Sequence, residues 1–434
     1  MQADPKMEQR VLYIVYWGAL EPLGRSLVLP AVCELAGLGA TLTLVTFEKP
    51  ADLADQSETR TLRTLMWSKG IKWVPLGYHK QPKLPATAFD VFSGLARAVI
   101  LGLRSRPDIV HARTFVGGLI GAAVAFVLRA KFVYHNEGFY PDEQVDAGVW
   151  KAGSAPHRLS LSLERRMYAG ADGVIALSER AKAAIERIPA VKQKATPVIA
   201  VPSCVDLDHF SPASPRRAWT GKSIRFIYIG SVGGRYLLDK IGRFTAIASQ
   251  MMESVSLRVL TRAEPDLVAR MVDSGGLPRE SWSLDCVSRN EMPGELAHRD
   301  VGLFFLSTGL SEHGCSPTKI GEYWAMGLPV ISTPNVSDSD EIIRRERVGV
   351  IVNDHSDESY RKAVSELISL LRDPETSGRC RRAAERHYSL KPACRRQALL
   401  YNRLCLPAPT ADAYSPEVAA GLVDLHTQAP GESK

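Results

Sequence analysis

The sequence predicts an α/β protein built from two doubly wound parallel sheets. Short runs rich in Val and Ile alternate with segments of helical period along the first 200 residues, which is typical of a parallel sheet covered by helices. The same alternation restarts at residue 223, after a segment at 206–222 that is rich in Pro, Ser and Arg. With 434 residues, the chain is long enough for two domains with separate cores.

In the first half, each expected strand is an apolar run bounded by polar or turn residues. These runs lie at 10–17, 40–47, 71–78, 107–113, 130–136, 172–178 and 196–202. Apolar residues at helical spacing fill most of the segments between them, as at 27–38 and 89–103. We therefore expect residues 1–205 to form the first domain.

In the second half, the strand pattern is repeated and charged helical sequence follows it. The expected strands lie at 223–231, 255–261, 281–287, 301–307, 328–333 and 349–354. We expect residues 206–222 to be a linker and hinge, and residues 223–406 to form the second domain. The last segment, 407–434, is rich in Pro, Ala and Gly, so we expect a disordered tail there.

The composition is typical of a soluble globular protein, with 45% hydrophobic and 23% charged residues. The first ten residues, MQADPKMEQR, lack the apolar core of a signal peptide. The seven cysteines are scattered, without a CxxC pair or the spacing of a metal site. We therefore expect a cytoplasmic protein with reduced thiols and no metal ion.

The positive charge is concentrated in the first half. Residues 1–200 carry 25 Lys and Arg against 18 Asp and Glu, whereas residues 201–434 carry 29 of each. A basic surface on the first domain could bind an anionic membrane or a phosphorylated acceptor. The alternative is a basic surface that binds no partner. Nucleic acid is disfavoured, because the basic residues are dispersed and no binding motif accompanies them. The helical segment 89–106, with Arg97, Arg104 and Arg106 around an apolar stripe, is the candidate membrane contact; alternatively it packs in the core.

A short helix is expected to begin near residue 317 and to offer an anion site. Ser316 suits the N-cap, Pro317 suits the first helical position, and Gly327 supplies a stop. A helix N-terminus has N–H groups without intrahelical partners and a partial positive charge, so it can hold a phosphate. An ordinary capped helix is the alternative.

The side chains beside this N-terminus suit a nucleotide diphosphate. Thr318 and Lys319 add hydrogen-bond donors, and Glu322 lies one turn further along the same face. A carboxylate at that distance from a phosphate site could accept the hydroxyls of a ribose. The alternative is a simple Lys–Glu pair on a helix surface.

A glycine-containing loop follows the first strand of each half. In the first loop, Gly24 would let the backbone approach a ligand and Arg25 opens the next helix, although a tight turn without a ligand has the same composition. The second loop could wrap a diphosphate with a guanidinium as its charge partner; its residues are Gly230, Gly233, Gly234 and Arg235. It is not the dinucleotide fingerprint GxGxxG, which disfavours an oxidoreductase.

Polar side chains gather after two strands of the first half. They are His111, Arg113, His135, Glu137, Asp142 and Glu143. A histidine or carboxylate at a strand end could orient or deprotonate an acceptor hydroxyl. His135 beside Glu137 is the better candidate, whereas we expect His111 to be structural.

Taken in order, these segments resemble a retaining glycosyltransferase of family 4 from the bacterial cell-surface polysaccharide branch. The similarity runs from about residue 11 to residue 354 and rests on EPLGRSLVLPAVCELAGLGATLTLVTFEKP, VHART, NEGFYPDEQVDAGVW, VIALSERAK, VPSCVDLDHFSP, YIGSVGGRYLLD and SPTKIGEYWAMGLPV. The resemblance implies the GT-B fold, in which two Rossmann-like domains face a cleft. It also implies a hexosyltransferase that uses a nucleotide sugar, needs no metal or other cofactor, and acts on a glycan or lipid-linked acceptor.

The resemblance also implies roles for individual residues. Arg235 and Lys319 would bind the donor diphosphate and stabilise the leaving group, and Glu322 would bind the ribose. His135 would lie near the transferred sugar. The remaining assignments are the donor-side residues Gly230, Gly233, Gly234, Ser316 and Thr318, and the acceptor-side residues Gly24, Arg25 and Glu137.

Three positions depart from the family pattern. Gly314 stands where the broader family has its first glutamate, and Glu312 is out of register. Glu137 stands where the branch has an arginine, and Arg25 where it has a glutamine. Two alternatives therefore remain: a nucleotide-sugar epimerase of the same two-domain plan, and an inactive protein that binds sugar nucleotides. The DSD sequence at 338–340 is a possible Mg²⁺ motif, but we expect a solvated loop.

Overall fold

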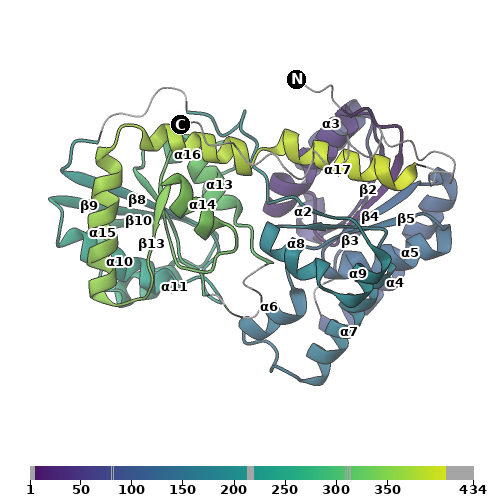
Figure 1. Cartoon of the computed structure of the whole chain (residues 1–434), viewed down its shortest axis with the longest axis horizontal. Coiled ribbons are helices and arrows are strands. Elements are labelled where there is room, and N and C mark those ends of the chain that lie inside the picture. The colour runs from purple at the N-terminus through teal and green to yellow at the C-terminus, as the bar shows by residue number, and fades with distance from the viewer. Residues whose placement is uncertain are drawn as a thin grey trace, which may run out of the picture.

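The structure of the protein is a computed structural model that describes residues 5–79, 81, 83–212, 219–307, 309, 311 and 314–406, without the side chains of Lys83 and Leu84. It confirms the predicted fold class, because two parallel sheets lie side by side, each between layers of helices (Figure 1). The predicted tail, 407–434, lies outside the described residues.

The first sheet has seven parallel strands in the order β3-β2-β1-β4-β5-β6-β7. Its strands are β1 (Arg10–Val15), β2 (Thr41–Glu48), β3 (Lys72–Gly77), β4 (Ile109–Arg113), β5 (Lys131–His135), β6 (Gly173–Ala176) and β7 (Val198–Ala200). The order reverses between β1 and β4. Ligands of open α/β sheets bind beyond the carboxyl ends of the strands at such a reversal.

Helices cover both faces of this sheet. They are η1 (Gly24–Val28, a π-helical turn), α1 (Leu29–Gly37), α2 (Pro50–Ala54), α3 (Gln56–Ser68), α4 (Lys83–Ser105), α5 (Phe115–Leu128), α6 (Tyr140–Asp146), α7 (Ala155–Gly170), α8 (Glu179–Glu186) and α9 (Pro189–Lys194). Residues of α1 and α3 form the core on one face, and residues of α4, α5 and α7 form it on the other.

The second sheet has six parallel strands in the order β10-β9-β8-β11-β12-β13. Its strands are β8 (Ser223–Ile229), β9 (Ser254–Leu260), β10 (Trp282–Asp285), β11 (Val301–Phe304), β12 (Val330–Ser332) and β13 (Gly349–Ile351). The helices that follow in the chain are α10 (Leu238–Ser249), α11 (Pro265–Ser274), η2 (Arg279–Ser281), α12 (Met292–Ala297), α13 (Thr318–Ala325), α14 (Ser339–Glu346), α15 (Asp357–Arg372), α16 (Thr376–His387) and α17 (Leu390–Cys405).

The last helix, α17, returns to the first domain and lies across its sheet (Figure 1). Its Ala393, Cys394, Ala398 and Tyr401 belong to the core built on β1 and α1. The predicted boundaries, 1–205 and 223–406, place α17 in the second domain because of its position in the chain. Its side chains pack in the first domain.

The chain crosses between the domains twice, at adjacent places. The backbone N–H of Val205 donates to the carbonyl of Tyr388 at 2.8 Å, next to the start of α17. Of the predicted hinge, residues 206–212 and 219–222 are described, and Phe210 is buried in the core of the second domain.

Candidate active site between the two domains

Helix α13 starts without a side-chain cap. The structure begins the helix at Thr318, with Pro317 at the N-cap position and no side chain that accepts a hydrogen bond there. The predicted N-cap, Ser316, is wrong, because its hydroxyl accepts a hydrogen bond of 2.9 Å from the backbone N–H of Ser203 in the first domain. The first N–H groups of α13 are thus left for another acceptor, and the loop before them is tied to the opposite domain.

Lys319 and Glu322 form an ion pair on the first turns of α13. Lys319 Nζ lies 2.9 Å from Glu322 Oε2, and the carboxylate is buried while the lysine is partly exposed. A buried carboxylate needs such a partner, and the pairing holds the ammonium near the start of the helix. The pair fits both predicted readings, a diphosphate and ribose site or a helix-stabilising pair.

Arg235 is turned toward the loop that precedes α13. Gly233 and Gly234 have positive φ values of 88° and 61°, which let the chain after β8 bend back. Arg235 Nε donates to the carbonyl of Ser307 at 3.2 Å, and its Nη2 lies 3.7 Å from Cys315 Sγ. The structure therefore brings Arg235 next to Cys315, the residue that precedes Ser316.

The glycine loop of the first domain is held by a residue that the sequence did not suggest. A Cβ at Gly24 would collide with the carbonyl of Gly18, so the loop closes on itself only with glycine there. Glu48, at the end of β2, is buried and accepts hydrogen bonds from the backbone N–H groups of Ala19 and Leu20. A single acidic residue ending an apolar strand was the signal that could have identified it.

The structure does not bring the two predicted acceptor-side charges together. Arg25 donates to the carbonyl of Leu20 at 3.0 Å and pairs with Glu58 of α3. Glu137 pairs instead with Arg113, whose guanidinium is buried at the end of β4. Arg25 thus lies against α3, whereas Glu137 lies at the carboxyl edge of the sheet.

A buried histidine lies beside Glu137, and a second buried histidine contacts the first. His135 Nε2 is 3.4 Å from Glu137 Oε1, and His135 Nδ1 is 3.2 Å from Nε2 of His111. Burial lowers the pKa of both imidazoles well below the usual value, and the positive charge of Arg113 lowers it further. Both side chains are therefore neutral at pH 7.

Glu143 places a carboxyl at the same edge, opposite the second domain. Burial raises its pKa to about 7, with Arg235 across the cleft opposing the shift and Glu137 adding to it. Among the described residues, no hydrogen bond or ion pair holds this carboxyl. A carboxyl that is half ionised near neutral pH and faces a guanidinium can exchange a proton with a bound hydroxyl.

The close approach of the domains explains the glycine at position 314. A Cβ on Gly314 would lie 2.9 Å from the Cα of Gly138 and 3.0 Å from the backbone N of Phe139. Real side chains do not tolerate such contacts with backbone atoms. In this arrangement of the domains, a glutamate at this position would collide with the loop before α6.

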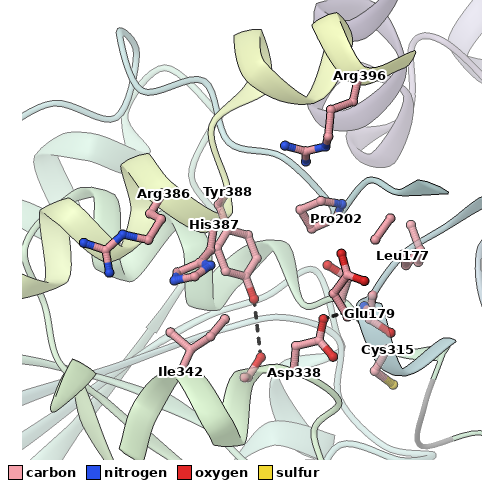
Figure 2. A pocket seen from close by; sticks show the side chains of 14 residues that line it. Leu177, Glu179, Pro202, Cys315, Asp338, Ile342, Arg386, His387, Tyr388 and Arg396 are labelled. Carbon is pink, nitrogen blue, oxygen red and sulfur yellow. Dashed lines mark hydrogen bonds between the residues drawn. The ribbon is translucent and has the colours of Figure 1, made fainter. Parts of the chain in front are cut away.

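A cavity of about 260 Å³ lies between the domains on the hinge side of this site. Figure 2 shows Arg386, His387 and Tyr388 on one side of it, and Asp338 and Cys315 on the other. It shares Cys315 and Ser316 with the site, but it is not lined by Arg235, Lys319 or Glu322. The cavity therefore lies at the hinge and is not the proposed donor-binding site.

The expectation of a solvated loop at 338–340 is wrong. Asp338 accepts hydrogen bonds from the backbone N–H groups of Glu179 and Arg180 at the start of α8, across the domain boundary. Asp340 is buried and accepts from Asn335 and Val336. Within the described residues, no three His, Cys, Asp or Glu side chains are grouped as metal ligands would be.

Models of two protein families match this chain. Residues 27–204 match the glycosyl transferase 4-like domain, and residues 225–370 match the glycosyl transferases group 1 family. No curated protein sequence matches. The first matched region contains β2 to β7 and begins after β1, and the second contains most of β8 and all of β9 to β13.

Solved structures with the GT-B fold match both domains together. The chain is similar to Anabaena Alr3699/HepE in complex with UDP, with a TM-score of 0.63, 14% identity, and 91% of this chain and 100% of that chain covered. It is similar to WaaG, a glycosyltransferase involved in lipopolysaccharide biosynthesis, with a TM-score of 0.62, 14% identity, and coverage of 90% and 98%. A UDP-N-acetylglucosamine 2-epimerase from Listeria monocytogenes, described as putative, matches with a TM-score of 0.56, 13% identity, and coverage of 93% and 99%.

Proposed function

Because this chain consists of a glycosyl transferase 4-like domain followed by a glycosyl transferases group 1 domain in the GT-B fold, we propose that it transfers a hexose from a nucleotide-diphosphate sugar to a glycan or lipid-linked acceptor, with retention of configuration. We assign it to the cytoplasm and to bacterial cell-surface polysaccharide synthesis. The neighbours that bind UDP or UDP-glucose support a uridine nucleotide as the donor.

The observation that carries this proposal is the group of donors around the start of α13. Lys319 lies on the first turn of this uncapped helix, and Arg235 lies beside Cys315 in the loop that precedes it. When the bond from the anomeric carbon to the diphosphate breaks, negative charge develops on the leaving oxygen. Fixed donors aimed at that charge lower the barrier without a metal ion.

The remaining assigned residues complete the donor and acceptor sides. Buried Glu322 would accept the ribose hydroxyls once Lys319 turns to the phosphate, and the Gly230 to Gly234 loop would cover the diphosphate. His135 would donate to the transferred sugar. The Gly24 loop and Glu137 would face the acceptor, and front-face displacement would let the leaving phosphate take the acceptor proton.

Transfer can be tested directly with a panel of nucleotide sugars. The full chain is incubated with UDP-, GDP- and TDP-hexoses and a crude lipid-linked or glycan acceptor, and nucleotide release, product and anomeric configuration are measured. Transfer with retention supports the proposal. Interconversion of the sugars without an acceptor favours the epimerase alternative, and a melting-temperature shift with no turnover favours an inactive binding protein.

Helix α4 carries the surface that we propose faces an anionic membrane. The segment Pro85–Ser105 is long and apolar enough to cross a bilayer by length and composition. Its inner side is nevertheless fitted to the domain, because buried Asp90 accepts hydrogen bonds from Tyr16 Oη at 2.9 Å and from the backbone N–H of His79 at 3.0 Å. A helix anchored in this way lies along the surface of the domain and does not span the bilayer.

The outward side of α4 is apolar and its surroundings are basic. Its exposed large side chains, 48% to 71% accessible, are Phe89, Phe92, Ile100 and Leu103. Phe126 and Val127 of α5 extend this surface near the end of α4, where Gly102 lies against Leu128. The exposed arginines of the surface are Arg97, Arg104, Arg106 and Arg129. Apolar insertion combined with positive charge suits anionic lipid, and through it a lipid-linked acceptor.

A further inference from the structure

A continuous row of buried side chains leads from α17 to the candidate site. Gln397 Nε2 donates to Tyr401 Oη at 2.7 Å, and Tyr401 Oη lies 2.5 Å from His111 Nδ1. His111 Nε2 then lies 3.2 Å from His135 Nδ1. Each of these four residues is at most 2% exposed, so water does not compete for the hydrogen bonds.

The direction of the protons follows from the first partner in the row. The Gln397 amide gives an N–H to Tyr401, so the Tyr401 hydroxyl gives its own proton to His111 Nδ1. A neutral His111 must then carry its proton on Nε2 and donate it to His135 Nδ1. The single proton of neutral His135 is left on Nε2.

The other end of the row favours the same direction. His135 Nε2 faces Glu137 Oε1 at 3.4 Å, and the carboxylate of Glu137, paired with Arg113, can only accept. Nε2 is buried and makes no hydrogen bond within the described part of the chain. The N–H at Nε2 is therefore an unpaired donor that could bind a ligand acceptor. The other groups that face the two imidazoles are the stacked ring of Tyr13 and the guanidinium of Arg113.

We propose that Tyr401 and His111 are positioning residues that fix His135 as a neutral hydrogen-bond donor through Nε2, so that His135 holds the transferred sugar and cannot act as a base. This inference rests on the proposed function. In this proposal α17 does more than pack against the first domain, because its Tyr401 determines the tautomer of His135.

The tautomer can be read without measuring activity. In the full chain labelled with ¹⁵N-histidine, with His135 assigned by a His135→Gln variant, we expect His135 to show a protonated Nε2 and a bare Nδ1. Tyr401→Phe removes the donor to His111, so we expect a mixture of tautomers at His135. Gln397→Glu places an acceptor at the start of the row, so we expect the direction to reverse and Nε2 of His135 to lose its proton.

The second domain offers a matched control. Tyr360 is a fully buried tyrosine whose Oη lies 2.9 Å from Nδ1 of His355, so Tyr360→Phe removes the same kind of bond in the other domain. We expect kcat to fall roughly 5- to 10-fold in Tyr401→Phe, with the donor KM little changed, and to stay near the parent value in Tyr360→Phe.

A bare Nε2 on His135 in the parent chain, or an unchanged ¹⁵N pattern in Tyr401→Phe, overturns the inference. An equal loss of kcat in Tyr360→Phe also overturns it, because the loss would then reflect stability alone. If the tautomer is as expected but no donor supports transfer, the proposed function fails and the positioning of His135 still stands.

Discussion

Lys319 pairs with the buried carboxylate of Glu322 near the uncapped start of α13. Substitution of this lysine is therefore the most direct test of the phosphate assignment. We expect Lys319→Ala and Arg235→Ala each to lower kcat about 10²- to 10³-fold, because losing a donor at a developing charge costs on the order of 2–4 kcal/mol. Steady-state kinetics and thermal melts check this. Lys362→Ala, at an exposed position of α15, should change neither, and near-normal turnover in both site variants would move the diphosphate elsewhere.

Glu143 predicts a pH dependence of the reaction. Because burial raises its pKa to about 7, its carboxylate forms mainly above that pH. If its carboxylate accepts a hydrogen bond from the acceptor hydroxyl, kcat/KM should rise with pH through about 7. Glu143→Gln should flatten this rise and lower activity at pH 8, whereas Glu366→Gln on α15 should keep the parent profile. A parent profile without a rise near pH 7 would remove Glu143 from the reaction.

The raised pKa of Glu164 in α7 leads us to expect that the stability of the protein depends on pH. Its carboxyl is buried, and burial, with Asp142 and Glu143 nearby, raises its pKa from 4.5 to about 8. Between these two values the folded chain holds a proton that the unfolded chain has released, so stability falls as pH rises through this window.

A glutamine at position 164 cannot ionise, so it removes the cost of burying a carboxylate at high pH. We expect Glu164→Gln to melt higher than the parent chain at pH 8, by roughly 2–4 °C for each kcal/mol relieved, and the difference to vanish near pH 4.5. Melting curves across this range measure it. A variant that is less stable at pH 8 would show that the carboxylate has a partner in the folded chain.

At the scale of elements, α4 is built with two different faces. Its inner row of residues is spaced by four and consists of Ala86, Asp90, Gly94, Ala98 and Gly102, all buried. These small side chains let α5 and β2 approach closely, as Gly94 does with Phe47. The large apolar side chains are thereby left on the outside, where the sequence predicted a membrane contact.

This face can be tested by vesicle binding. We expect the full chain to cosediment with phosphatidylglycerol vesicles and to be released between 0.15 M and 1 M salt, as the Debye length falls from about 8 Å to about 3 Å. Phe92→Ser with Leu103→Ser should weaken binding about tenfold or more, because each buried apolar side chain contributes roughly 1.5–3 kcal/mol. Arg97→Glu with Arg104→Glu should abolish the salt-sensitive part.

Helix α3 on the opposite face of the sheet supplies the controls. Trp67 is 83% exposed and Arg60 is exposed, so Trp67→Ser and Arg60→Glu match the two changes without touching α4. Equal loss in these controls, or parent binding that ignores salt, would contradict the membrane contact. Self-association in sedimentation experiments that the α4 variants abolish would assign this face to a second copy.

At the scale of the whole molecule, hydrogen bonds from both sides hold the domains together. Asp146 of α6 accepts from the backbone N–H of Ser311 at 2.9 Å and from its hydroxyl at 2.6 Å. Asp338 accepts from the start of α8, and Ser316 accepts from Ser203. These contacts join the two domains at separate places, so they stabilise the arrangement in which Arg235 faces Glu143.

Loss of one contact should open the cleft. We expect Asp146→Ala to increase the radius of gyration measured by X-ray scattering, and to raise the apparent donor dissociation constant up to roughly tenfold, because hydrogen bonds to a charged group contribute about 1.5–3 kcal/mol. Asp273→Ala, on the exposed side of α11, serves as the control. An unchanged radius and affinity in Asp146→Ala would mean that this contact does not govern closure.

The sequence alone determined the two sheets and the edges at which the site forms. Continuous apolar runs can be satisfied only by strands that are covered on both faces, and polar loops after such runs gather at one edge of a parallel sheet. For this reason the pairs Lys319 with Glu322 and His135 with Glu137, which the structure shows in contact, could be expected from the sequence.

Tertiary structure alone decided which partner each of these side chains takes. Tyr401 and His111 are 290 positions apart, and no local pattern indicates that α17 returns to the first sheet. Arg25 pairs with Glu58 because η1 packs beside α3 in the first domain. Ser316 binds Ser203, and Gly314 fits the loop before α6, because the two domains pack at van der Waals distance. Short-range periodicity encodes which face of an element is buried, whereas the identity of the neighbour depends on how whole elements pack.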